Sequence, residues 1–439
     1  MKFLSPINRE VLRLAGPSIV ANITVPLVGI VDLAIAGHIG GASVIGGIVI
    51  GGLLFDLLYW NFSFLRTGTG GITAQAFGRG DWKACIGTFS QGIATALASS
   101  FLLLAVQWVF ASAMLAVFQC SPEVEAIARQ YFFIRIWAAP ATLSLFVFKG
   151  WFIGMQNTLF SMLTDIWVNV VNMVVSWVLA FHTPLGVGGI AVGTVIAQWT
   201  GALFALLLMG LRYRSLLHQT TIFHSMKWKY FRIFFSVNVN LFVRSLLMMV
   251  VYGGFTVFAN QYGDTELAVS EIMMKMLLLY SYLTDGFAYA GEAMTGRFIG
   301  EGNGAALRST VFWVFFWSLL IGAVSTVAYG LFPRDLVGLL TDDSSVLAAC
   351  EPYLFWLLLM PLVSCIAFTW DGIFTGATAT ASLRNAMIGA VVCFVACFYG
   401  LRGLVGIQAL YAGYFAHLLY RSVHMTVAWR GSPRVSPRV

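Results

Sequence analysis

The sequence predicts an all-α integral membrane protein with twelve transmembrane helices in two parallel-repeat six-helix bundles around a central cavity. Apolar residues make up 59% of the 439 residues and charged residues only 10%, whereas soluble domains contain about 25% charged residues. The mean hydropathy of +0.85 reflects apolar character along the whole chain. No alternating apolar and polar strand pattern is present, so helices are the expected spanning elements.

The apolar blocks indicate where the spans lie. A hydrocarbon core about 30 Å thick requires roughly 20 apolar residues per helix. Division at polar and Gly/Pro breaks predicts twelve spans, of which the eleventh is the shortest: 12–36, 43–70, 84–116, 126–155, 158–181, 187–211, 230–258, 266–295, 308–332, 345–375, 383–400 and 403–428. We therefore expect an N-terminal bundle (1–211), a cytoplasmic linker (212–229), a C-terminal bundle (230–428) and a disordered basic tail (429–439).

Basic residues predict the orientation of these spans. They gather in short clusters on one side of the blocks, as at Arg9, Lys83, Lys229 and Arg421. The positive-inside rule then places both termini in the cytoplasm, and we expect a multi-pass protein of the bacterial inner membrane. Clusters between apolar blocks do not form a phosphate-binding face, so no nucleic-acid partner is expected.

An internal repeat relates the two halves at a shift of about 222 residues. "FGRGDWKA" (77–84) falls on "IGEGNGAA" (299–306), and "FKGWFIGMQNT" (148–158) falls on "WDGIFTGATAT" (370–380). Each half has an even number of predicted spans, so the halves have the same orientation and are related by an axis along the membrane normal. Two such halves around a central site are typical of a secondary transporter and argue against a simple pore.

Asp32 is a carboxylate in the middle of the first predicted span. Its helical neighbours three and four residues away are Val28, Gly29, Ile35 and Ala36, none of them basic. Apolar surroundings favour the neutral form of a carboxylate, which suits a group that binds and releases a proton. A neutral Asp with a purely structural hydrogen bond remains the alternative.

Two prolines lie on the same predicted helix as this aspartate. Pro17 and Pro26 each remove a backbone hydrogen bond, and a proline inside a helix favours a bend. We therefore expect a hinge near these residues.

Other polar groups in the predicted spans are candidates for a substrate cavity or for helix contacts. The fifth span carries a polar stripe at helical spacing: Asp165, Asn169, Asn172 and Ser176. Lys149 and Asp371 occupy equivalent repeat positions, so Asp371 is either a coupling or substrate group or the partner of Lys149 across the two bundles. Glu271 and Lys275 have the spacing of an ion pair on one helix turn.

Neither a cofactor nor a metal site is expected. The six cysteines have no metal-binding or disulfide pattern, and the six histidines form no HExxH-type motif. These observations argue against a membrane enzyme.

Three stretches resemble the multidrug and toxic compound extrusion (MATE) family, in its DNA-damage-inducible protein F-like branch. They are "PLVGIVDLAIAGHIG" (26–40), "FLRTGTGGITAQAFGRGD" (64–81) and "DGFAYAGEAMTGRFIGEG" (285–302). The resemblance implies twelve helices and export of amphipathic, often cationic, small molecules in exchange for protons or sodium. It also implies no cofactor, and we expect a monomer whose partners are its substrate and the lipid bilayer.

The resemblance further implies which residues couple transport to the ion. Asp32 matches the aspartate of the first helix, Tyr131 the tyrosine of the fourth, Asn172 the asparagine of the fifth and Thr194 the threonine of the sixth. Ser176 stands where a second aspartate is expected, which argues against a two-acid proton relay and against a multi-oxygen sodium site. We therefore predict a proton-coupled exporter, with a substrate cavity that includes Asp165, Asn169 and Asp371. Sodium coupling and a lipid-linked precursor flippase are the alternatives.

Overall fold

The computed structural model describes residues 5–218, 228–341 and 344–431, and every regular element within these ranges is helical. The first half contains α1 (Pro6–Ile39), α2 (Ala42–Asn61), α3 (Phe64–Gly78), α4 (Trp82–Phe118), α5 (Pro122–Arg135), α6 (Ala139–Gly154), α7 (Thr158–His182) and α8 (Val187–His218). The second half contains α9 (Trp228–Asn260), α10 (Asp264–Glu301), α11 (Gly304–Leu331), α12 (Pro333–Gly338), α13 (Ser344–Cys350), α14 (Leu354–Gly376), α15 (Thr380–Val405) and α16 (Gln408–Gly431).

The twelve predicted spans each fall on a long helical stretch, so the predicted fold class is confirmed. Eleven stretches within the described residues are long and apolar enough to cross a membrane. Three of these stretches each combine two helices, namely α2 with α3, α5 with α6, and α13 with α14. The eleventh span, predicted to be the shortest, is not, because α15 is 26 residues long and α16 is 24 residues long. The twelfth, α16, is the helix outside this set, and its buried His417 and Arg421 are among the polar residues that it carries.

The long helix α1 contributes to both compact units of the fold. One unit comprises residues 1–19 and 236–439, and the other comprises residues 20–235. The start of α1 packs on the second half of the chain: Asn8 Oδ1 accepts a 2.7 Å hydrogen bond from Trp317 Nε1, and Glu10 pairs with Arg297 at 2.8 Å. The division thus differs from the predicted boundary, which placed all of residues 1–211 in the first bundle.

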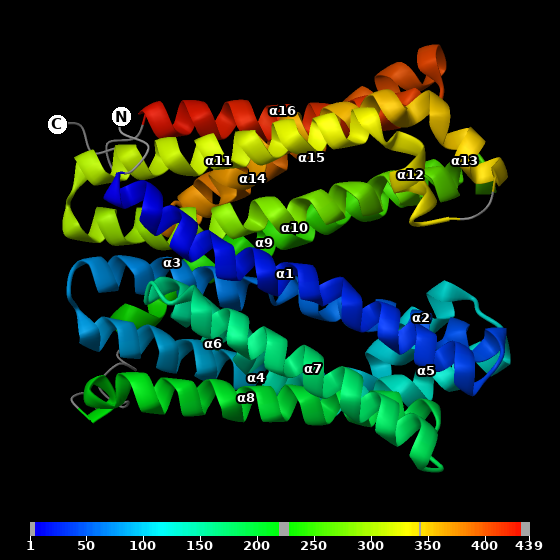
Figure 1. Ribbon diagram of the computed structural model, residues 1–439, viewed down its shortest axis with the longest axis horizontal. Coiled ribbons are helices and arrows are strands. Elements are labelled where there is room, and N and C mark those ends of the chain that lie inside the picture. The colour runs from blue at the N-terminus through cyan, green and yellow to red at the C-terminus, as the bar shows by residue number, and fades with distance from the viewer. Residues whose placement is uncertain (1–4, 219–227, 342–343, 432–439) are drawn as a thin grey trace. The chain divides into compact units, whose positions relative to one another are not determined.

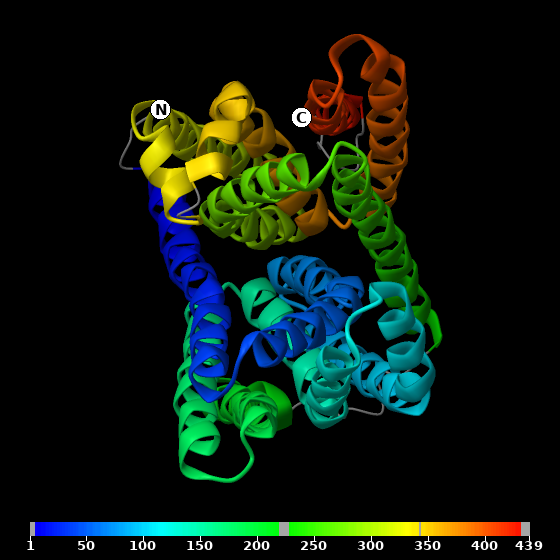
Figure 2. The same ribbon diagram turned by 90° about the vertical axis from the view of Figure 1, so that its right-hand side faces the viewer.

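Pro17 and Pro26 both lie inside α1, which is continuous over 34 residues (Figure 2). The helix is not broken at either proline, and the expected hinge stays a prediction. Within the unit of residues 20–235, α7 and α8 form a helical hairpin (Figure 1).

The predicted linker and tail are partly helical. Helix α8 continues to His218 and α9 begins at Trp228, while α16 continues to Gly431. Residues 219–227 of the linker and 432–439 of the tail lie outside the described residues.

The internal repeat reappears in local detail. Asp81 caps α4 by accepting a 3.0 Å hydrogen bond from the Ala84 amide, and Asn303 caps α11 in the same way from Ala306. Side-chain caps of this kind satisfy backbone donors that a helix start leaves free.

The close helix crossings repeat as well. A Cβ atom on Gly150 would lie 2.0 Å from the Arg66 carbonyl oxygen, and one on Gly372 would lie 2.1 Å from that of Ala288. Both pairs are related by the shift of about 222 residues. Glycine therefore permits the same α3–α6 and α10–α14 contact in each half.

Candidate functional site

Asp32 lies in the part of α1 that belongs to the unit of residues 20–235. Its Oδ1 atom is buried and has no hydrogen-bond partner among the described residues. Its nearby positive charge is Arg135 of α5. The absence of a basic neighbour on its own helix was correctly predicted, but the tertiary structure supplies a cation from another helix.

Arg135 and Tyr131 form a pair on consecutive turns of α5. Arg135 Nη1 donates a 3.0 Å hydrogen bond to the Tyr131 hydroxyl, and Tyr131 is 1% exposed. The guanidinium also lies 4.6 Å from the Phe55 ring centroid of α2, a favourable cation–π contact. Gly51 faces the Tyr131 ring, so α2 can approach α5 closely.

Arg135 is a functional candidate that was not predicted from the sequence. The available signal was its position four residues after Tyr131, inside a predicted membrane span.

Three of the predicted coupling residues meet where α7 crosses α8. Asn172 Nδ2 donates to Thr194 Oγ1 at 2.9 Å, and the hydroxyls of Thr194 and Ser176 both donate to the Ile190 carbonyl, at 3.2 and 3.3 Å. A Cβ on Gly193 would lie only 2.3 Å from Ser176 Oγ. This tight crossing favours a small side chain at position 176, a physical reason for serine where the resemblance implied aspartate.

The remainder of the polar stripe on α7 connects to two other helices. Asn169 Nδ2 donates a 2.7 Å hydrogen bond to Thr24 Oγ1 of α1. Asp165 forms an ion pair with Lys149 of α6. Polar side chains of this stripe therefore join α7 to α1, α6 and α8, which is one of the two roles that the sequence left open.

In the other unit, Asp371 of α14 holds two arginines. Its Oδ2 atom accepts hydrogen bonds of 2.5 Å from Arg244 of α9 and from Arg421 of α16. Lys149 and Asp371 thus each have a partner within their own unit, and the predicted alternative that they pair with one another is wrong.

Arg421 was predicted to be one of the basic residues at the cytoplasmic surface, but it is buried. It is 2% exposed, and His417 one turn earlier on α16 is 1% exposed. The buried cluster carries two cationic side chains and one carboxylate, and neither Asp371 Oδ1 nor Arg421 Nη1 has a hydrogen-bond partner among the described residues.

The ion pair predicted for one turn of α10 joins Glu271 and Lys275. Glu271 accepts a 2.7 Å hydrogen bond from Thr256, and in the described ranges it forms no ion pair with Lys275, so that predicted pair is wrong. No group of three or more His, Cys, Asp or Glu side chains converges within the described parts of the chain.

Two repeated helical halves, each with a buried polar cluster, define a polytopic membrane transporter. Residues 17–178 and 241–399 match the MatE family, and the chain belongs to this family. Its members are transporters and not enzymes. The predicted family is thereby confirmed. The two matched segments start at residues 17 and 241, an offset close to the predicted repeat shift.

Known relatives agree with this assignment. DNA damage-inducible protein F of Escherichia coli K12 is 31% identical over 98% of this chain and 94% of its own, in line with the predicted branch. Multidrug and toxin extrusion protein 1 of Mus musculus is 24% identical over 92% of this chain and 70% of its own.

Solved structures share the fold. An outward-facing multidrug resistance MATE family transporter has a TM-score of 0.88 at 16% identity, covering 99% of this chain and 97% of its own. A MATE structure in the bent conformation has a TM-score of 0.87 at 16% identity, covering 99% and 96%.

Proposed function

We propose that this chain is a secondary active exporter, an antiporter of amphipathic or cationic small molecules, coupled to protons through Asp32. Membership in the MatE family supports transport, and the names of its relatives refer to multidrug and toxin extrusion. The observation that carries the proton coupling is the buried Asp32 Oδ1 without a hydrogen-bond partner among the described residues, close to Arg135. We further propose that the protein lies in the bacterial inner membrane with both termini in the cytoplasm.

Protonation of Asp32 removes its charge and therefore its attraction to Arg135. The ionised carboxylate favours an arrangement in which α1 stays close to the Tyr131–Arg135 pair of α5. The neutral acid lacks this electrostatic preference, so α1 becomes free to bend at Pro26 or Pro17. Because α1 contributes residues to both units, a changed bend would affect both halves of the transporter.

The polar network of α7 and α8 supports a proton more than sodium as the coupling ion. A sodium site requires several oxygen atoms that point to one place. Here the hydroxyls of Ser176 and Thr194 both donate to the Ile190 carbonyl, and Asn172 binds Thr194. Asn172 Oδ1 is the buried oxygen of this network without a partner in the described residues, and Ser176 supplies no second carboxylate, which supports a proton more than sodium.

Asp165 and Asn169 in one unit, and Asp371 in the other, are proposed substrate-binding residues. Two of them are ion-paired, Asp165 with Lys149 and Asp371 with Arg244 and Arg421. A cationic substrate at either carboxylate would therefore compete with a basic side chain of the protein.

The test is transport of the fluorescent cation ethidium by purified protein in liposomes, driven first by a pH gradient and then by a sodium gradient. We expect the pH gradient alone to drive transport, and Asp32→Asn to abolish it while the protein elutes as a single folded species. Glu125→Gln is the matched control, since it removes a carboxylate from a surface ion pair with Arg129. Transport driven by sodium, or normal transport by Asp32→Asn, would refute the proposed coupling.

A further inference from the structure

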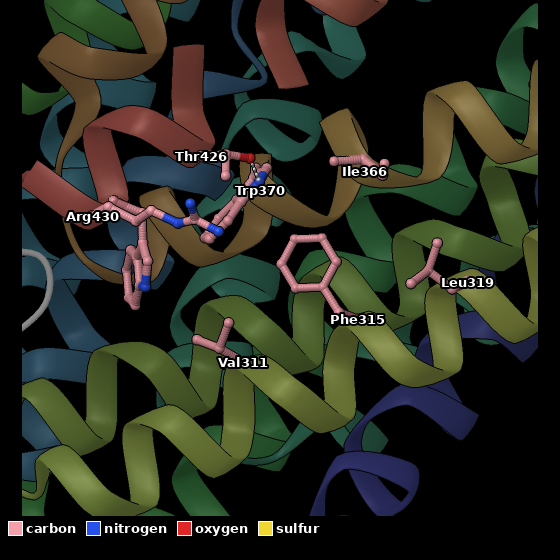
Figure 3. A pocket seen from close by; sticks show the side chains of 8 residues that line it. Val311, Phe315, Leu319, Ile366, Trp370, Thr426 and Arg430 are labelled. Carbon is pink, nitrogen blue, oxygen red and sulfur yellow. Dashed lines mark hydrogen bonds between the residues drawn. The ribbon is translucent and has the colours of Figure 1, made fainter. Parts of the chain in front are cut away.

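A cavity of about 360 Å³ opens between α11, α14 and α16 (Figure 3). One part of it is apolar: Val311, Phe315 and Leu319 project from α11, and Ile366 projects from α14. The surrounding surface is apolar too, since Phe312 is 47% exposed and Val427 64%. Exposed apolar side chains on these membrane-spanning helices indicate that the cavity faces lipid and not water.

The other end of the cavity is aromatic and polar. Trp370 Nε1 donates a 2.9 Å hydrogen bond to Thr426 Oγ1, which joins α14 to α16. The Trp370 ring lies 4.8 Å from Phe315 and 5.4 Å from Trp429 between ring centroids. Arg430 lies at this end of the cavity, next to Thr426 and Trp370 (Figure 3). Tryptophan beside arginine near the end of a spanning helix is typical of the membrane interface.

This end of the cavity is positively charged. Arg430 is exposed, and Arg308, one turn before Val311 on α11, is exposed as well. Neither arginine has an ion-pair partner within the part of the chain that the structure describes. No acidic residue lines the cavity, and Glu301 near the start of α11 is already paired with Arg297.

We propose that this cavity binds one anionic phospholipid, with the headgroup at Arg430 and Arg308 and an acyl chain along Val311, Leu319 and Ile366. The apolar part suits the chain, and the two arginines without acidic neighbours suit a headgroup with net negative charge. Basic pockets between membrane helices on the cytoplasmic side are a known kind of site for such headgroups. A zwitterionic lipid carries a compensating cation and gains less from these arginines.

The bound lipid would stabilise the contact between α14 and α16. Trp370 faces the cavity, while the next residue, Asp371, holds Arg421 of α16 on the interior side. The hydrogen bond from Trp370 to Thr426 and the ion pair of Asp371 with Arg421 thus join the same two helices. A lipid in the cavity adds packing to this junction and is expected to raise the thermal stability of the protein.

The experiment titrates the delipidated full chain, in neutral detergent, with phosphatidylglycerol or with phosphatidylcholine of the same acyl chains. Native mass spectrometry counts bound lipids, and tryptophan emission follows thermal unfolding. We expect one phosphatidylglycerol to bind preferentially and to raise the unfolding temperature more than phosphatidylcholine does. Glycerol phosphate without acyl chains serves as the headgroup control and should not reproduce the shift.

Two sets of variants separate this site from general surface charge. Arg308→Gln with Arg430→Gln should weaken binding about 25-fold, because each basic residue near an anionic surface contributes about 1 kcal/mol and 1.4 kcal/mol is about tenfold. The matched control, Arg212→Gln with Arg232→Gln, removes two exposed arginines from outside the cavity and should keep wild-type binding. Val311→Trp retains the charges but fills the apolar part, and should also weaken binding.

Equal loss of binding in both double variants would show that only the overall positive charge attracts the lipid, and would overturn the proposal. Equal binding of phosphatidylcholine, or a shift produced by glycerol phosphate alone, would overturn it too.

Discussion

The carboxylate of Asp371 is predicted to be the main stabilising charge of its unit. Asp371→Asn keeps the size of the side chain but removes the charge that Arg244 and Arg421 share. The two guanidinium groups then repel one another without a counter-ion. Arg421 cannot move into solvent, because it is 2% exposed and enclosed by α14 and α16.

The expected loss of stability follows from this burial. Removing one partner of a buried ion pair typically costs about 3–5 kcal/mol. The side chain of Asp371 is 19% exposed and that of Arg244 is 16% exposed. Because this partial solvation weakens the ion pair, we expect the loss of unfolding free energy to be about 2–3 kcal/mol. For a domain of this size, roughly 2–4 °C corresponds to 1 kcal/mol. We therefore expect the unfolding temperature to fall by about 4–12 °C.

The assay is thermal unfolding of purified protein in detergent, followed by tryptophan emission at one fixed heating rate because membrane proteins unfold irreversibly. The double variant Asp371→Asn with Arg421→Met removes the buried unpaired charge and should recover most of the loss. Asp335→Asn is the surface control, since Asp335 is exposed, and should stay within about 0.5 kcal/mol of wild type.

An unfolding temperature of Asp371→Asn equal to that of the surface control would refute this reasoning. So would a double variant that is less stable than the single variant, because the loss would then not come from the unpaired Arg421.

Two further predictions concern the repeated helix contacts. Gly150→Ala should destabilise the protein by about 1–3 kcal/mol, because the new Cβ would lie 2.0 Å from the Arg66 carbonyl oxygen and α3 would have to move. Gly52→Ala is its control: no atom lies within 4 Å, so better helix propensity should leave stability equal or slightly higher. The same thermal unfolding assay measures both variants. Equal stability of Gly150→Ala and Gly52→Ala would contradict the close contact between α3 and α6. Asn303→Ala should cost about 1 kcal/mol through loss of the cap on the Ala306 amide, whereas Asn303→Asp should retain stability; no loss in Asn303→Ala would show that the cap contributes nothing.

Much of the fold could be predicted from the chain because membrane insertion leaves a clear linear signal. Each apolar block needs only local information, namely its length and its lack of charge, and all twelve blocks fall on helical stretches. The repeat was equally visible, because glycines that permit a close crossing occur at the same spacing in each half. Helix α16 is not among the eleven apolar stretches. It carries polar residues, such as His417 and Arg421, whose burial the sequence does not reveal.

The candidate site was predicted less completely, because its contacts join residues distant in the chain. The carbonyl of Ile190 brings Ser176 and Thr194 together, and spacing on α7 alone suggested only that Ser176 faces a neighbour. The charge close to Asp32 comes from Arg135 on α5, which no inspection of α1 could find. The pairing of Lys149 with Asp165 was hidden in the same way.

The sequence by itself therefore determined the class of protein, the approximate positions of the apolar spans, the duplication and the family. Only the tertiary structure decided which charges neutralise one another and that the start of α1 packs with the second half of the chain, as the contact of Asn8 with Trp317 shows. The physical reason is that hydrophobic length acts along the chain, whereas ion pairs and hydrogen bonds depend on distances of about 3 Å between side chains that folding alone brings together.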